Sequence, residues 1–221
     1  MDKENLVASL EDSLTENLFD TVADLTEVGL DAVMDDGVLK EIPLLSTVAG
    51  IYKIGHTIKE RHTIKQLALF VTELNKGCVD KNKRNRILEK LNGNQQQSKQ
   101  EIEYILVVLD SYLEYEKPKM LAKLYMAYLE QRIGWTEFLM YAAILRTLLP
   151  QDVRILQSHD FNAGALICMQ MDSASWLRLL SAGFVYEQGV MRFNGDISKN
   201  HDLDVPYSIT KFGQKFVDIV G

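Results

Sequence analysis

Apolar residues recur at spacings of three and four through most of the first two thirds of the chain, and this periodicity restricts the fold more than any other feature. An α-helix turns once every 3.6 residues, so this spacing places apolar side chains on one face that must be covered. We therefore expect a mainly α protein whose residues 1–149 form a helical bundle. The clearest stripes are Leu6, Leu10 and Leu14; Ile102, Ile105, Leu106, Leu109 and Leu113; and Leu121, Leu124, Tyr125 and Tyr128.

Turn and capping residues divide this region into separate helices. Pro43 and Pro118 suit the first turn of a helix, where the missing N–H is not needed. Asn92-Gly93 is expected to end a short basic helix. Thr136 is expected to cap a further helix, TEFLMYAAILRTLL, whose nearly all-apolar surface predicts a central place in the bundle.

The long run from Leu44 to Asn75 changes phase along its length. On a helical projection the apolar residues from Leu44 to Ile58 share one face, whereas those from Ile64 to Leu74 share another. A straight helix cannot bury both faces against one neighbour. We expect a kink or a helix boundary near Arg61 and His62.

Within this run the stretch HTIKERHTIK, residues 56–65, repeats four letters and so suggests a pair of histidines. Residues six apart on a helix are separated by about 120° around the axis, whereas helical metal pairs use spacings of three or four. His56 and His62 therefore do not share a face. We expect no metal and no cofactor here.

Charge is distributed unevenly along the chain. Residues 1–50 contain two lysines against twelve acidic residues, whereas residues 51–100 contain eleven Lys and Arg against four acidic residues. The basic section either lies against the acidic section in the same fold or attracts an anionic partner. For the second case we expect the cations of two adjoining helices to form one partner-binding patch: Lys59, Arg61, Lys65, Lys81, Lys83, Arg84 and Arg86.

The compartment is expected to be the cytoplasm. The N-terminal MDKENL lacks the basic-then-apolar order of a secretory signal, and Cys78 and Cys168 lie in no CxxC pair. The charge-free run Ile42–Tyr52 is too short for a transmembrane helix, which needs about 20 apolar residues. Together with the lysines that follow, it leaves a membrane-surface effector as one alternative.

The last seventy residues change character. They predict two helices, short strands at FVYEQ, VMRFN and VPYSI, and a terminal helix at TKFGQKFVDIV. This order resembles the winged-helix family, and the resemblance implies a small α+β module over residues 150–221. The residues that carry it are Leu180, Gly183, Phe184, Tyr207, Ile209, Thr210 and Gly213.

Many winged helices bind DNA, which makes a DNA-binding transcriptional regulator a second alternative. Phosphate contacts need several Lys or Arg on one face, but the helix SASWLRLLSAG contains only one cation. The module is therefore expected to serve protein interaction, and nucleic acid is disfavoured as a partner. The cations available to DNA would be Arg178, Arg192 and Lys199.

A second resemblance concerns Asp36–Leu74, DGVLKEIPLLSTVAGIYKIGHTIKERHTIKQLALFVTEL. It is similar to a segment of small bacterial and prophage proteins of the abortive-infection (Abi-alpha) kind, with an Ile-Pro step before a glycine-containing apolar helix and a basic continuation. The resemblance implies a role in conflict between phage and host.

Catalytic motifs do not emerge from the sequence, which contains no GxSxG, GxxxxGK[ST] or HExxH pattern. The adjacent pairs His159-Asp160 and His201-Asp202 lack the surrounding His and Asp that a metal phosphohydrolase needs. We expect a non-enzymatic interaction or regulatory protein of bacterial or phage origin. It would bind a protein partner through helical faces, and self-association into a homo-oligomer is also open.

Overall fold

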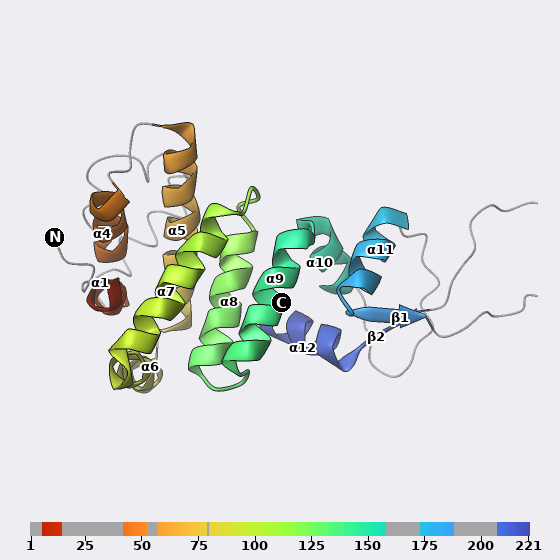
Figure 1. The fold of residues 1–221 in the computed structure, drawn as a ribbon. Helices are drawn as coiled ribbons and strands as arrows, with labels where there is room; N and C mark the ends of the chain where they lie inside the picture. Colours follow the sequence, from red (N-terminus) through yellow and green to blue (C-terminus); the bar gives the residue numbers. More distant parts are fainter. Residues whose placement is uncertain (1–5, 15–41, 53–56, 79, 158–172, 188–206) are drawn as a thin grey trace, which may run out of the picture. The chain divides into compact units, whose positions relative to one another are not determined.

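The computed structural model describes residues 6–14, 42–52, 57–78, 80–157, 173–187 and 207–221 (Figure 1). The predicted strand VMRFN falls outside these ranges. The chain forms two compact units, residues 1–142 and 143–221, which are described separately. The described part is mainly helical, as the periodicity predicted.

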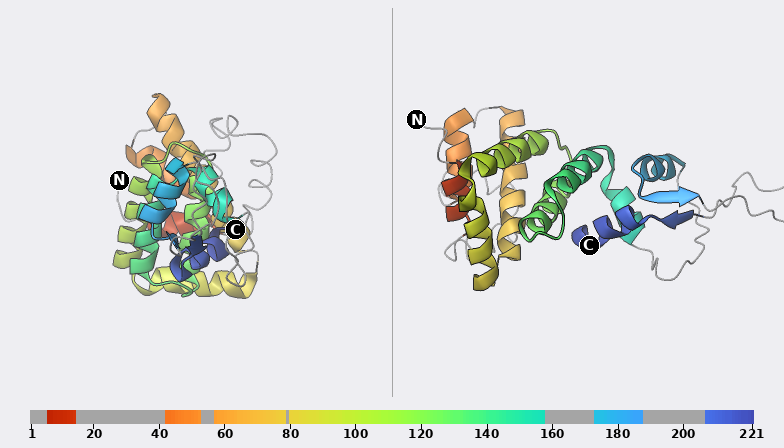
Figure 2. Two further views of the ribbon diagram at one scale, coloured as in Figure 1. Left: turned by 90° about the vertical axis from the view of Figure 1, so that its right-hand side faces the viewer. Right: turned by 60° about the horizontal axis from the view of Figure 1, so that its bottom comes forward.

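Unit 1–142 is built from helices alone among its described residues. In Figures 1 and 2, α7, α8 and the start of α9 lie side by side, with α6 at the far end of α5. The helices are α1 (Leu6–Asp12), α4 (Pro43–Tyr52), α5 (Ile58–Gly77), α6 (Lys81–Gly93), α7 (Gln95–Asp110), α8 (Lys117–Leu129) and α9 (Trp135–Thr147), of which the last continues into the second unit.

The main core lies where α5 packs along α8 and α7. Burying an aliphatic or aromatic side chain stabilises the fold by about 1.5–3 kcal/mol, so these stripes hold the unit together. The predicted stripes are buried as expected, except that Leu113 is 80% exposed because α7 ends at Asp110. The buried side chains of α5 and α8 include Ile64, Leu67, Phe70, Val71, Leu74, Leu121, Leu124, Tyr125 and Tyr128.

The Leu44–Asn75 run is divided, but four residues earlier than the predicted boundary near Arg61. α5 begins after Thr57 and continues unbroken through Arg61 and His62. A capping box sets this start, because the Glu60 N–H donates to Thr57 Oγ1 while the Thr57 N–H donates to the Glu60 carboxylate. Ile58, assigned to the first apolar face, is 89% exposed.

The predictions for α9 need two corrections. Thr136 is not its cap but its second residue, since the helix begins at Trp135. The helix is also not buried all round, because Met140 is 51% exposed while Phe138 and Tyr141 are buried. α9 therefore uses one face for the core, as an amphipathic surface helix does.

α1, which belongs to the acidic N-terminal section, packs on the bundle. Its buried leucines, Leu6 and Leu10, pack with Leu14 where α1 meets α4, α6 and α7. Three polar contacts fix it: Ser9 Oγ lies 2.7 Å from Thr47 Oγ1, the Leu44 N–H donates to Ser13 Oγ, and Asn75 Nδ2 donates to the Ser13 carbonyl. One acidic helix thus lies beside the basic helix α6.

Unit 143–221 contains three helices of its own and a two-stranded sheet among its described residues. The strands are antiparallel, with Val185 opposite Ile209 and Tyr186 opposite Ser208. Its elements are the end of α9, α10 (Pro150–Gln157), α11 (Ser173–Ser181), β1 (Val185–Glu187), β2 (Tyr207–Ile209) and α12 (Lys211–Val220).

A glycine–threonine contact joins the sheet to α12. Gly183 has φ of 69°, which lets the chain turn from α11 into β1. Thr210 Oγ1 donates to the Gly183 carbonyl and accepts from the Gly213 N–H, so one hydroxyl ties the turn to the start of α12. The Thr210 N–H donates to the Phe184 carbonyl. At Gly213 a Cβ would lie 2.4 Å from that same carbonyl oxygen.

Gly213→Ala is therefore expected to destabilise the fold by about 1–3 kcal/mol, because the added methyl group must displace backbone. Gly93→Ala is the matched control, since a Cβ at that exposed helix end meets nothing within 4 Å. Urea unfolding followed by circular dichroism measures both. Equal midpoints for the two variants would contradict the proposed close approach of α12 to Phe184.

Candidate functional site

The start of α5 carries most of the polar residues of the repeated HTIK stretch, and Thr57, Lys59, Glu60 and Thr63 make side-chain contacts there. Thr57 and Glu60 form the capping box. Lys59 Nζ lies 3.0 Å from the Asp110 carboxylate, and Thr63 Oγ1 donates to the same carboxylate over 2.7 Å. The start of α5 is thereby tied to the end of α7.

Asp110 is the centre of this polar group. Burial alone would raise the pKa of Asp110, but the hydrogen bonds from Thr63 and Lys59 outweigh it and hold that pKa below its ordinary value. The Lys59 cation also stands near the carboxyl end of α7, where the helix dipole favours positive charge. The carboxylate is therefore charged and already paired within the chain.

His62 takes part in the same junction between helices. Its Nε2 lies 2.8 Å from the Tyr112 carbonyl oxygen and 2.9 Å from Gln66 Nε2, which also donates to that carbonyl. The ring also lies 5.4 Å from the Tyr115 ring. His62 thus lies beside a carbonyl just beyond α7, while His56 falls outside the described residues. In the described ranges no three His, Cys, Asp or Glu side chains are grouped for a metal.

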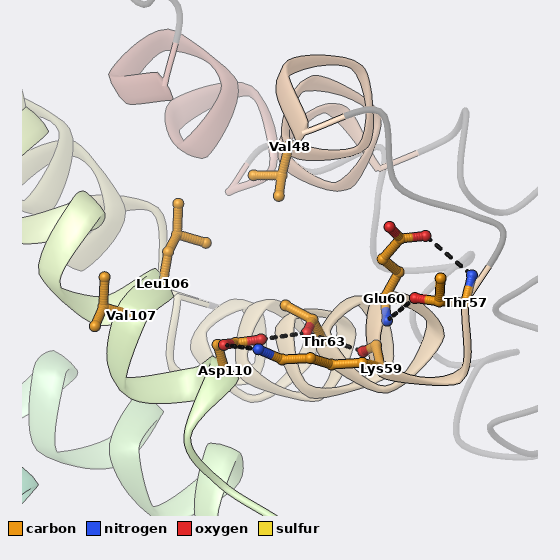
Figure 3. A pocket seen from close by; sticks show the side chains of 8 residues that line it. All are labelled: Val48, Thr57, Lys59, Glu60, Thr63, Leu106, Val107 and Asp110. Atoms are coloured by element: carbon orange, nitrogen blue, oxygen red, sulfur yellow. Dashed lines mark hydrogen bonds and ion pairs between the residues drawn. The ribbon is translucent and has the colours of Figure 1, made fainter.

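A cavity of about 440 Å³ lies above this polar group, between α4 and the paired ends of α5 and α7 (Figure 3). Val48, Leu106 and Val107 form its apolar part. Its polar part consists of Thr57, Lys59, Glu60, Thr63 and Asp110.

Large apolar side chains are exposed around the same end of the helix pair. Ile58 on α5, Val107 on α7 and Leu113 just beyond α7 are 89%, 71% and 80% exposed. A contiguous exposed apolar patch is a mark of an interaction surface. We call the cavity together with Ile58, Val107 and Leu113 the α5–α7 surface.

The predicted seven-residue basic patch is not formed. Lys59, Arg61 and Lys65 lie near the start of α5, whereas α6 follows its far end (Figure 1). Between Lys65 and Gly77 the helix rises about 18 Å, and α6 packs on α1 and α7 instead of folding back along α5. The cations therefore form two separate groups.

The α6 group is also less available than predicted. Arg84 is only 6% exposed and donates to the Cys78 carbonyl, and Lys83 forms an ion pair with Glu130. Lys81 and Arg86 are exposed, although Arg86 Nε donates to the Asn82 carbonyl. Whether Lys81 or Arg86 binds a partner stays a prediction.

Arg178, the cation on α11 that was predicted for DNA contact, forms an ion pair within the chain. Arg178 donates to both oxygens of the Asp152 carboxylate, at 2.7 and 2.9 Å, and Asp152 is fully buried. Burial raises the pKa of Asp152, but Arg178 and the Leu149 N–H outweigh it and lower that pKa. A bidentate pair of this kind is strong and directional. Arg178 therefore holds α11 to α10, and Arg192 and Lys199 lie outside the described residues.

Arg178→Met is expected to lower the stability of the chain by about 2–3 kcal/mol, because it leaves the buried Asp152 carboxylate without its cation. Lys211→Met, which removes an exposed cation from the same unit, serves as the control. Thermal denaturation near pH 7 compares the two. A variant as stable as the control would contradict the structural role of Arg178.

The Asp110 junction predicts a pH dependence. Its folded pKa lies below the unfolded value of about 4, so its stabilisation is present above that value and is lost as pH falls through the folded pKa. Asp110→Asn is expected to cost about 1 kcal/mol at pH 7, because the pair is partly exposed. The deficit against wild type should shrink in unfolding experiments near pH 3. A deficit that did not change with pH would exclude this assignment.

In the described part of the chain no helix has the length and apolar character needed to span a bilayer. No protein-family model, curated protein or solved structure matches this chain.

Proposed function

We propose that the chain is a non-enzymatic interaction protein that binds a protein partner through the α5–α7 surface. The observation that supports this most is the combination of a preformed cavity with three large apolar side chains exposed around it. Covering such side chains is favourable by about 25 cal/mol for each Å² of apolar surface removed from water.

The chemistry of the cavity supports recognition rather than reaction. The Asp110 carboxylate is engaged by Lys59 and Thr63, and the Glu60 carboxylate accepts from the N–H of Thr57. A general base or nucleophile must present a free atom to its substrate. Here the polar groups stabilise one another and shape the floor of the cavity.

A protein partner fits this surface better than a membrane does. A lipid surface is approached by apolar side chains that project from a convex face with cations beside them. The α5–α7 surface is concave at its centre, and the ammonium group of Lys59 is paired with Asp110. A cavity of this size accepts two or three aliphatic side chains, as helix-in-groove complexes do.

The biological setting in this proposal is the cytoplasm of a bacterial cell, in conflict between phage and host. Its support is the resemblance of Asp36–Leu74 to abortive-infection proteins. Residues Thr57–Thr63 of that same segment form one side of the α5–α7 surface. The proposed partner is therefore a protein of the host or of the phage.

A photo-crosslinking residue at Val107 tests the proposal in cells that produce the full chain. We expect a discrete protein adduct at Val107 and none at Met140, an exposed apolar position on α9 that serves as the matched control. Leu113→Glu should abolish the adduct, because it places a charge beside the apolar contact. Since Leu113 is exposed, this substitution should leave the melting temperature within about 2 °C.

The purified partner identified from the adduct should then bind the wild-type chain, and Val107→Glu should weaken that binding at least about tenfold. Adducts of equal strength at Val107 and Met140 would refute the assignment of the surface. An adduct composed of two copies of this chain would replace the proposed partner with self-association.

A further inference from the structure

We propose a second binding site, for a small organic cation such as an alkylguanidinium or alkylammonium ion, in the cavity between the starts of α7 and α9. The residue that would carry recognition is Glu101. This site is separate from the α5–α7 surface, and it depends on none of the arguments made for the protein partner.

Glu101 is a buried acid held by neutral donors. It is 4% exposed, and one carboxylate oxygen accepts from Tyr128 Oη at 2.6 Å and from Gln97 Nε2 at 2.8 Å. The other oxygen has a single long contact, 3.4 Å from Tyr125 Oη. A carboxylate can accept about four hydrogen bonds, so this second oxygen retains capacity for a donor.

The tyrosines fix the carboxylate without neutralising it. Burial raises the pKa of Tyr128, and Glu101 raises it further, so the hydroxyl stays protonated and donates. Burial likewise raises the pKa of Tyr125. Neutral donors orient the acid but supply no opposite charge.

Lys90 is close enough for its charge to interact with Glu101, but its ammonium group is engaged elsewhere. Its Nζ donates to the Tyr128 carbonyl at 2.7 Å and stands 3.7 Å from the centre of the Tyr128 ring. Within the described residues no cation lies at ion-pair distance from Glu101. Buried acids are almost always paired with a cation. Glu101 is not paired in the described part of the chain, so a bound cation could pair with it.

The cavity beside Glu101 has a volume of about 660 Å³, within the range of small-molecule sites. Tyr104 and Trp135 line it together with the side-chain amides of Gln97 and Gln100. Both aromatic residues are half-buried, and their rings meet edge to face with centres 5.9 Å apart.

This aromatic wall is itself held in place. Trp135 stacks on Phe138, with ring centres 4.9 Å apart, and its ring centre lies 5.1 Å from that of Tyr128. The faces of Trp and Tyr attract guanidinium and ammonium groups, most strongly where water is excluded. The amide oxygens of Gln97 and Gln100 can accept the remaining N–H groups of the ligand. A buried carboxylate, aromatic faces and amides together fit an organic cation.

Isothermal titration of the full chain with n-butylguanidinium tests the site, and n-butylurea serves as the neutral probe of nearly the same shape. We expect the cation to bind and to change the fluorescence of Trp135, and the urea to bind at least tenfold more weakly. Glu101→Gln should reduce binding at least tenfold. Glu103→Gln, an exposed acid on the same helix, should leave it unchanged and so controls for attraction by the acidic chain.

Leu139→Phe provides a second route, because it fills the cavity while leaving Glu101 and its tyrosines in place. This substitution should also weaken binding of butylguanidinium at least tenfold. The result does not depend on whether the Glu101→Gln variant is stable. The proposal is overturned if butylguanidinium does not bind, if butylurea binds as well, or if both variants bind like wild type.

Discussion

The packing of α5 along α8 is the contact on which the rest of unit 1–142 depends. α8 contributes Leu121, Leu124 and Tyr125 to it, and α5 contributes a stripe that begins at Ile64. At 1.5 Å per residue, α5 is about 30 Å long and α8 about 20 Å, so α5 is the longer partner. The start of α5 lies before this stripe, and Lys59, Thr63 and His62 hold it to Asp110 at the end of α7 and to Tyr112 just beyond it. Because this junction is polar and partly exposed, it leaves a cavity with apolar walls beside it.

The helices could be predicted from the sequence because their stripes are long and regular, and the exceptions have physical causes. Leu113 continues the stripe of α7 in sequence but not in space, since the helix ends three residues before it. The boundary at Thr57 was readable as a capping box, Thr-x-x-Glu, although the phase change pointed four residues later. Arg84 was assigned to the surface by its type, yet it reaches the Cys78 carbonyl from a buried position.

The candidate sites were harder to predict because their key acids contact residues that are distant in the chain, and sequence patterns do not reveal those contacts. Asp110 meets Lys59 and Thr63 across about fifty residues, and Asp152 meets Arg178 across twenty-six. Glu101 lies four residues after Gln97, a spacing that the sequence offers, but its tyrosine donors come from α8. Lys59 was predicted from its charge to belong to a basic patch, whereas in the structure it pairs with Asp110 and lines a cavity.

The central claim is that the α5–α7 surface is open to solvent in the free protein and is covered by a partner in the cell. Carbene footprinting with mass spectrometry measures this at individual side chains, with Ile105 and Leu109 as buried references on the same helix. The account predicts that Val107 and Leu113 label strongly in the purified chain and are protected in cells, whereas Met140 labels equally in both. Labelling of Val107 in the purified chain as weak as that of Leu109 would contradict it.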